Sequence, residues 1–193
     1  MMEFYDVVKK RKSIKKFKTG ELDRDKLLKI IDAAMRAPSW KNSTPYKFII
    51  VDKDNLKDII AGAIINKSYE TAEAVSNAPA AIVIVADPND SGFVEEKDLY
   101  LVDSAIAMEH LILAATEEGY GTCWIASFDE KKIKEALEIP DNYRVVALTP
   151  IGESAEEEEE KPHKPKKDVR DYLYANKWNE SYMDQNVKVL VHH

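Results

Sequence analysis

The sequence predicts a three-layer sandwich of the α+β or α/β class, and three observations support this prediction. The chain has 193 residues, 45% of them hydrophobic, which is enough to bury a full core in one domain of ordinary size. Helical and strand patterns alternate along most of its length. Residues Ala80 to Ala86 form an apolar, β-branched run typical of a strand buried on both faces. Helices and strands mixed in this way indicate layers of helix on a sheet.

The first part of the chain predicts helices before and after one strand. Apolar spacing indicates a short helix around residues 4–8 and a longer one that follows Asp23, a suitable N-cap residue. The longer helix must stop by Ala37, because a proline follows and disfavours helical geometry in the residue before it. A strand is expected at Tyr46–Val51, and Asp54 is expected to cap another short helix.

The second part predicts a long helix, two strands and a further helix. Residues 98–118 are apolar around most of a helix, and Gly119 is expected to end it. A short strand is expected at 122–127, a helix capped by Asp129 up to Leu137, and a last strand at 145–151. A helix that is apolar nearly all round must be covered on nearly all sides. Its own core or a second subunit can supply that cover.

Charge divides the chain into three expected segments. Residues 1–153 form the folded domain, and 154–167 form an exposed connector with five consecutive glutamates followed by lysines and prolines. Residues 168–193 form an arm with apolar and aromatic side chains, which must pack on its own domain or on a partner subunit. Without the glutamate run, the chain has 30 acidic and 28 basic residues, so the rest of the protein is nearly neutral. This balance does not describe a nucleic-acid binder.

Cysteine and histidine usage excludes several kinds of site. One cysteine rules out an internal disulfide and a thiolate-rich metal site, and the four histidines lack ligand spacing, so no metal is expected. The opening residues Glu3 to Asp6 do not form a signal peptide, and no uncharged apolar stretch reaches the roughly 18 residues of a membrane span. We therefore expect a cytoplasmic protein.

The segment Arg11 to Phe17 is the strongest candidate for a binding site. Seven cations lie within positions 9–18, interrupted by Ser13. Arginine, lysine and serine together suit a phosphate group, through a planar fork, a point charge and a hydroxyl donor. The alternative is a solvated helix end.

Self-contained catalytic machinery is not evident in the sequence. The phosphate-binding, dinucleotide-binding, serine-hydrolase and zinc-protease motifs are all missing, and Gly119-Tyr120-Gly121 is only a fragment of a dinucleotide motif. Cys123 lies in an apolar stretch and is expected to be a buried, inert thiol. If the protein is an enzyme, a bound cofactor carries the chemistry.

Five short motifs, in the right order, resemble those of the FMN-dependent nitroreductase family. They are Arg11–Phe17, similar to R-R-S-x-R-x-F; Pro38–Tyr46, similar to P-S-x-x-N-x-Q-P-W; Ala78-Pro79 before an apolar strand; Gly119–Ile125 after the long helix; and Pro150–Gly152 at a strand end. A Lys-Pro-Lys patch at 164–166 and the sequence Asn176–Trp178 also fit, so the resemblance covers about residues 4–178. Lys12 and Lys15 replace arginines, Thr44 a glutamine and Tyr46 a tryptophan.

The resemblance implies a fold and an assembly. Expected are a three-layer α/β/α sandwich, a mixed and mainly antiparallel central sheet, and a domain-swapped C-terminal arm that packs on the partner subunit. The protein would be a homodimer with two FMN molecules at the subunit interface. NAD(P)H would reduce FMN, and a nitroaromatic, quinone or related acceptor would then be reduced in ping-pong fashion, with no protein acid required. The alternatives are a specialised reductase, such as a dehalogenase or a flavin-remodelling enzyme; a flavin-binding protein without turnover; and a basic-arm interaction module.

The resemblance also implies roles for individual residues. Arg11 and Ser13, with two tail lysines, would surround the phosphate, and Lys15 would lie at the N1/O2 edge of the ring. The segment that begins at Pro38 would contact the ribityl chain and ring from the partner subunit, and backbone amides at 126–127 would face N5. Asn66 and Lys67 fall where relatives contact the pyrimidine ring. The full set of expected cofactor-binding residues is Arg11, Lys12, Ser13, Lys15, Pro38, Ser39, Trp40, Asn42, Thr44, Trp124, Ile125, Ala126, Ser127, Lys164 and Lys166. The alternative for two of these residues is a purely structural role, in which Pro38 only stops a helix and Asn42 only makes a turn.

Overall fold

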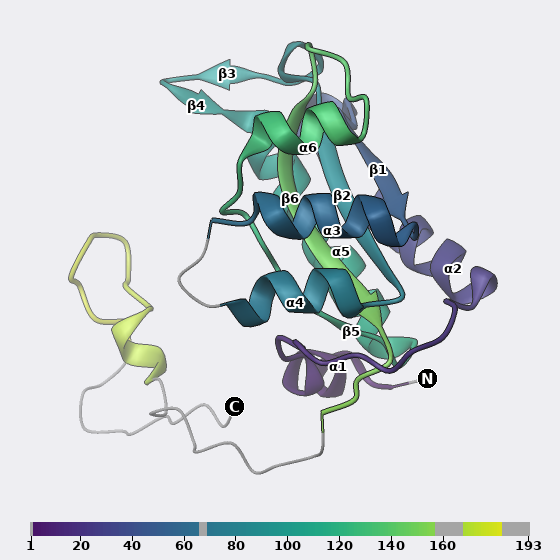
Figure 1. The fold of residues 1–193 in the computed structure, drawn as a ribbon. Coiled ribbons are helices and arrows are strands. Elements are labelled where there is room, and N and C mark those ends of the chain that lie inside the picture. The colour runs from purple at the N-terminus through teal and green to yellow at the C-terminus, as the bar shows by residue number, and fades with distance from the viewer. Residues whose placement is uncertain (1, 66–68, 157–167, 183–193) are drawn as a thin grey trace. The chain divides into compact units, whose positions relative to one another are not determined.

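The computed structural model describes residues 2–65, 69–156 and 168–182. The chain divides into two compact units, Met1–Glu156 and Glu157–His193, and each is described by itself. The first unit carries helices α1 to α6 and a central sheet (Figure 1). The predicted boundaries at 153 and 167 stay predictions, because most of the connector lies outside the described residues.

The central sheet has four strands in the order β1-β2-β6-β5, and each neighbouring pair is antiparallel. The strands are β1 Tyr46–Val51, β2 Ala80–Ala86, β6 Arg144–Gly152 and β5 Gly121–Thr122. Ser13 adds an isolated parallel bridge to Thr122, so the sheet is mixed and mainly antiparallel, as predicted. Every residue of β2 is buried, which confirms the prediction of a strand covered on both faces.

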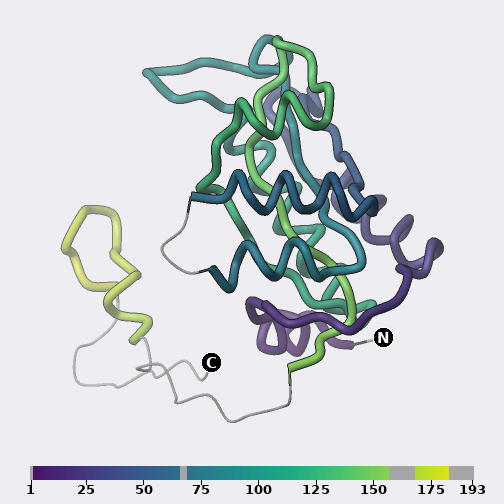
Figure 2. Tube along the Cα trace, viewed as in Figure 1, coloured from purple at the N-terminus to yellow at the C-terminus, as the bar shows by residue number. Residues whose placement is uncertain are grey.

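Helices cover both faces of this sheet and make three layers (Figures 1 and 2). The helices are α1 Phe4–Lys10, α2 Arg24–Met35, α3 Asp54–Ala63, α4 Tyr69–Asn77, α5 Leu99–Glu117 and α6 Glu130–Ala136. On one face, α2 and α5 pack on inward side chains such as Ile82 and Ile84. On the other, α3, α4 and α6 pack on Val83 and Leu148. Alternate residues of β2 therefore enter two different cores, because successive strand side chains point to opposite faces.

Helix α5 is the central core helix. Its buried side chains include Met108 and Leu111, and Gly119 follows its end with a φ of 85°, as expected of a glycine that terminates a helix. Among the described residues it is the one helix long and apolar enough to cross a membrane, and 50% of its most apolar window is buried inside the fold. Leu101 and Val102 remain 44% and 51% exposed, so the chain's own core covers only part of this helix.

Four features differ from the sequence-based predictions. Lys53 is the N-cap of α3, and Asp54 is its first residue, with a side chain 3.0 Å from Lys57 Nζ. The strand expected at 122–127 is reduced to β5, because the chain leaves the ladder and returns only for one bridge at Ile125. Helix α4 and the hairpin of β3 Phe93–Val94 and β4 Lys97–Asp98 were not predicted. Both are short and partly exposed, so their apolar periodicity is weak.

The second unit has one short 3-10 helix, η3 Val169–Asp171, among its described residues. Asp168 caps it by accepting a hydrogen bond from the Arg170 N–H. Farther along, the Tyr174 and Trp178 rings pack with their centroids 4.8 Å apart. The predicted packing of this arm on a partner subunit stays a prediction.

Candidate cofactor-binding site

The cationic segment is held as an extra edge of the central sheet. The Ile14 N–H donates to the Thr122 carbonyl oxygen at 2.8 Å, and the Lys18 N–H donates to the Glu153 carbonyl oxygen at 2.9 Å. Ile14 and Phe17 are buried, whereas Lys12 and Ser13 are exposed. Because the backbone and the apolar side chains are fixed to the sheet, the polar side chains between them present one defined surface.

Gly121 allows this close approach. A Cβ added at Gly121 would lie 2.5 Å from Ile14 Cγ1, which is closer than real Cβ contacts occur. Any larger residue here would push the cationic segment away from the sheet. Close packing against Ile14 therefore explains why Gly121 is a glycine in the Gly119–Ile125 motif. This packing sets the positions of Ser13 and Lys15.

Acidic side chains already pair with this segment. Lys15 Nζ donates to Glu70 Oε2 of α4 at 2.7 Å, and this hydrogen bond raises the pKa of Lys15. The Lys15 backbone N–H donates to Glu156 Oε1 at 2.9 Å, and Lys12 Nζ lies 4.0 Å from Glu156 Oε2. A carboxylate is thus bound by a backbone amide and a lysine of the segment. The residues present fit a phosphate-bearing cofactor, because the same donors serve a phosphate.

Cys123 lies under the segment, between β5 and Ile125. It is 7% exposed, and burial raises the pKa of its thiol, an effect that Lys15 and Ser13 offset in part. A thiol with a raised pKa is a poor nucleophile near neutral pH. The prediction of a buried, inert cysteine agrees with this environment.

Residues 124–127 continue along the same sheet edge. Ile125 is buried and exchanges two backbone hydrogen bonds of 2.9 Å with Leu148, which orients the exposed residues on either side of it. Trp124 is 39% exposed, and the Ser127 hydroxyl donates to the Ile65 carbonyl oxygen at 2.7 Å. The structure therefore brings Arg11, Lys12, Ser13 and Lys15 to the same edge as Trp124, Ile125, Ala126 and Ser127.

The loop from Pro38 to Thr44 has an unusual backbone. Lys41, Asn42 and Thr44 have φ values of 48°, 57° and 49°, in the left-handed region that non-glycine residues rarely adopt. The Thr44 N–H donates to Ser39 Oγ at 2.9 Å, and the Trp40 N–H donates to Asp103 Oδ1 at 2.8 Å. The 3-10 helix η1 Trp40–Asn42 lies inside this loop.

Within one chain, this loop and the cationic segment lie at opposite ends of the sheet. The loop leads into Tyr46, which pairs with Ala86, whereas Ser13 is connected through Thr122 and Ile151 to Ala80. Six strand steps of about 3.3 Å separate Ala80 from Ala86, or about 20 Å. A single small ligand in one chain therefore cannot touch both groups of expected residues.

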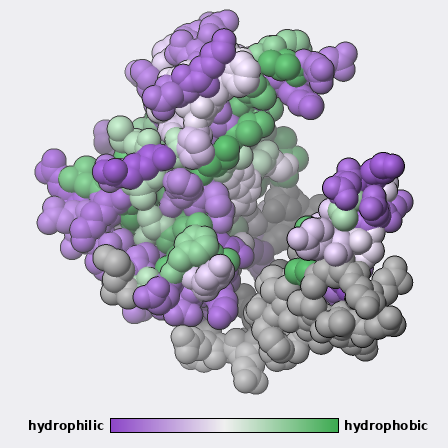
Figure 3. Space-filling view, turned by 180° about the vertical axis from the view of Figure 1, so that it is seen from behind, coloured by the Kyte–Doolittle hydropathy of each residue, from purple (hydrophilic) through white to green (hydrophobic). Residues whose placement is uncertain are grey.

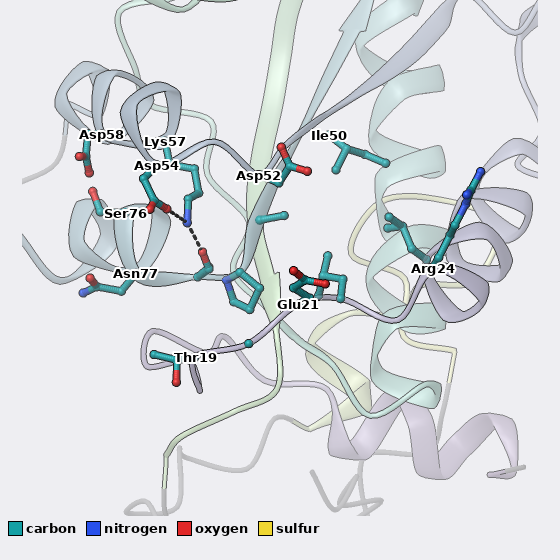
Figure 4. A pocket seen from close by; sticks show the side chains of 16 residues that line it. Thr19, Glu21, Arg24, Ile50, Asp52, Asp54, Lys57, Asp58, Ser76 and Asn77 are labelled. Atoms are coloured by element: carbon teal, nitrogen blue, oxygen red, sulfur yellow. Dashed lines mark hydrogen bonds and ion pairs between the residues drawn. The ribbon is translucent and has the colours of Figure 1, made fainter.

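A cavity of about 860 Å³ lies elsewhere (Figure 4). It is at the β1 edge of the sheet, and none of the expected cofactor-binding residues that the structure describes lines it. Its only buried cation, among the described residues, is Lys57, whose Nζ donates to the Ala78 carbonyl oxygen at 2.6 Å and pairs with Asp54.

Three acidic residues near the expected sites were not predicted, namely Glu70, Asp103 and Glu156. The sequence did contain a signal for Asp103, because it is a charged residue within the otherwise largely apolar helix pattern of 98–118. The predicted residues Asn66, Lys67, Lys164 and Lys166 lie outside the described residues.

The model of the nitroreductase family matches residues 8–153. The chain belongs to the nitroreductase family. This match covers the folded unit from the cationic segment to the end of β6, and it confirms the resemblance, the fold class and the prediction of an oxidoreductase. A curated relative from Archaeoglobus fulgidus, provisionally named as an NADH dehydrogenase/NAD(P)H nitroreductase, is 30% identical over 183 residues, covering 92% of this chain and all of that protein.

Solved structures of other nitroreductases have the same fold. A nitroreductase family protein from Clostridium novyi NT is 63% identical, with a TM-score of 0.78, and covers 96% of this chain and 100% of its own. An FMN-dependent nitroreductase from Clostridium difficile R20291 is 31% identical, with a TM-score of 0.67, and the match covers 94% of this chain and 92% of that one.

Proposed function

We propose that this nitroreductase binds FMN and uses NAD(P)H to reduce nitroaromatic, quinone or related planar acceptors by a ping-pong mechanism. The observation that carries the proposal is the carboxylate held on the cationic segment, where Glu156 accepts from the Lys15 N–H. An anion is thus accepted at the place where the family motif calls for the cofactor phosphate. The FMN-dependent relative from Clostridium difficile supports the same cofactor.

The chain's own residues have separate tasks in this proposal. Arg11, Lys12 and Ser13, with Lys164 and Lys166 of the tail, hold the phosphate. Lys15 places a fixed cation at the N1/O2 edge of the ring, where reduction develops negative charge. Bound FMN supplies the hydride chemistry. Backbone amides at 126–127 face the N5 edge, and Trp124 and the backbone of the buried Ile125 border the ring.

The loop at 38–44 acts in the other subunit of a homodimer. Pro38, Ser39, Trp40, Asn42 and Thr44 approach the ring and ribityl chain bound to the partner, because about 20 Å separates them from their own chain's cationic segment. The dimer is supported by exposed apolar side chains on α5, and Figure 3 shows hydrophobic surface on the side of the molecule that faces away in Figure 1. We place this enzyme in the cytoplasm, which fits α5 as a core helix.

Two spectroscopic measurements test the proposal. The purified chain is expected to take up FMN in a one-to-one ratio and to show the absorbance of an oxidised flavin. Anaerobic addition of NADH or NADPH should bleach this absorbance, and a quinone or nitroaromatic compound should restore it. A protein that binds no FMN contradicts the proposed cofactor. Bound FMN that neither nicotinamide bleaches contradicts the proposed reaction and leaves a flavin-binding protein without turnover.

A further inference from the structure

We propose that Asp103 is a positioning residue: it fixes the conformation of the 38–44 loop and thereby the contribution of that loop to the affinity for the flavin ring. Asp103 lies in the core helix α5 and is 3% exposed. Its side chain reaches the loop and also the residues that precede the β3–β4 hairpin. The inference rests on the proposed function for the role of the loop, and on the contacts below for the role of Asp103.

Both carboxylate oxygens of Asp103 are used. Oδ1 accepts the Trp40 N–H at 2.8 Å, and Oδ2 accepts the Ser91 hydroxyl at 2.8 Å. No ion pair to Asp103 occurs among the residues that the structure describes. A carboxylate buried without a cation is costly unless polar donors satisfy it. Asp103 therefore strongly favours the one loop conformation that delivers the Trp40 amide.

The loop needs an external anchor of this kind. Three of its non-glycine residues, Lys41, Asn42 and Thr44, have left-handed φ values, which are sterically unfavourable for residues with a Cβ. The bonds inside the loop are short-range contacts between Ser39 and Thr44 and between neighbours. Asp103 connects the loop to a rigid 19-residue helix instead.

The segment that precedes the β3–β4 hairpin supports the same loop from a second side. A Cβ added at Gly92 would lie 2.7 Å from Trp40 Nε1, so the indole ring lies directly against the Gly92 backbone. Ser91, which donates to Asp103, is the neighbour of Gly92. Asp103, Ser91 and Gly92 thus fix both the backbone and the ring of Trp40. The side chains that point outward from the loop are then free to contact a partner's flavin.

The test compares Asp103→Leu, Asp103→Asn and Ser104→Ala. Leucine keeps the volume and removes both acceptors, whereas asparagine keeps an acceptor for Trp40 and offers its amide to Ser91. Ser104 is the matched control, because its hydroxyl is the next side chain on α5, is fully buried and has no hydrogen-bond partner within the described chain. We expect Asp103→Leu to weaken FMN and riboflavin equally, by about tenfold. Asp103→Asn and Ser104→Ala should bind both flavins within about twofold of the wild type.

Trypsin cleavage after Lys41 gives a second readout that needs no flavin. Asp103→Leu should accelerate this cleavage, and the other two variants should not. If Asp103→Leu does not fold, Asp103→Ala replaces it, because it removes the same two acceptors without adding a large apolar side chain at this buried position; it should give the same two results.

Faster cleavage with unchanged flavin affinity overturns the positioning role, because the loop is then anchored by Asp103 without contributing to binding. Unchanged cleavage overturns the anchor itself. A wild type that binds no flavin overturns the proposed function and with it the role toward flavin, while the cleavage pattern still decides whether Asp103 anchors the loop.

Discussion

Lys15 and Glu70 form an ion pair with 2.7 Å between Nζ and Oε2, and it joins the cationic segment to helix α4. The glutamate side chain is 70% exposed, so water and salt weaken the pair. In the proposed complex the same ammonium group lies beside the flavin ring. Glu70 and the flavin ring therefore compete for one cation.

Replacing Glu70 with glutamine is expected to strengthen FMN binding about two- to threefold, since an exposed ion pair contributes less than about 1 kcal/mol. Titration of the apoprotein with FMN measures this. Glu73→Gln, one turn along α4 on an exposed position, is the control and should leave affinity unchanged. Weaker binding in the Glu70 variant would mean that the pair holds Lys15 in its binding position.

Replacing Lys15 with methionine keeps much of the aliphatic stem and removes the charge. Oxidised FMN should still bind, and the two-electron midpoint potential should fall by roughly 30 mV for each 1.4 kcal/mol of lost differential stabilisation. Reduction by NAD(P)H should slow, and reoxidation should not slow in parallel. Potentiometric titration and stopped-flow half-reactions measure these effects, with Lys16→Met as the exposed neighbouring control. An unchanged potential in a variant that retains FMN places Lys15 away from the ring.

Replacing Arg11 with alanine tests the phosphate end. The change removes a charge-assisted hydrogen bond of about 1.5–3 kcal/mol, so FMN affinity should fall roughly ten- to a hundredfold. Riboflavin lacks the phosphate and should bind nearly as before. Lys9→Ala removes a charge from the exposed part of α1 and serves as the control. Equal loss for both flavins would make Arg11 a structural residue.

A charge placed among the exposed apolar side chains of α5, Leu101 and Val102, should dissociate the proposed dimer. Val102→Glu puts a carboxylate where a 51% exposed apolar side chain now lies, and burying that charge in an interface is unfavourable. Sedimentation should show a dimer for the wild type, with or without flavin, and a 22.0 kDa monomer for the variant. Ile59→Glu changes a side chain of similar exposure, 47%, on α3 and should remain dimeric. A monomeric wild type at micromolar concentration contradicts the assembly.

Stability at acid pH should depend on Glu130. Its carboxylate accepts from Arg144 and from the Val145 N–H, and these bonds lower the pKa of Glu130 below its ordinary value of 4.5. A lowered folded pKa adds stability above pH 4.5, and that stability is lost as the pH falls through the folded value. Glu130→Gln should reduce the free energy of unfolding by about 1–2 kcal/mol at pH 7 and by less at pH 3. Denaturant titrations at both pH values measure the difference; equal losses would exclude the ionised pair as the cause.

The sequence by itself determined the layers, the strands β1, β2 and β6, the long helix and the family. These features come from local patterns, such as the apolar run of β2 and the glycine after α5, whose consequences do not depend on distant residues. The short elements escaped prediction for the complementary reason. Helix α4 and the β3–β4 hairpin bury few side chains, so their apolar pattern is weak. The predicted cap of α3 was wrong by one residue, because the N-cap is Lys53 and not Asp54.

Only the tertiary structure decided which residues share a site. The cationic segment meets residues 122–127 because it bridges to Thr122, more than a hundred residues later in the chain. The pairing of Tyr46 with Ala86 puts the other half of the expected site at the far end of the sheet. Glu70 and Asp103 acquire their roles through contacts across 55 and 63 residues. Long-range contacts of this kind arise from how the elements pack, and that packing cannot be derived from the pattern within any one segment.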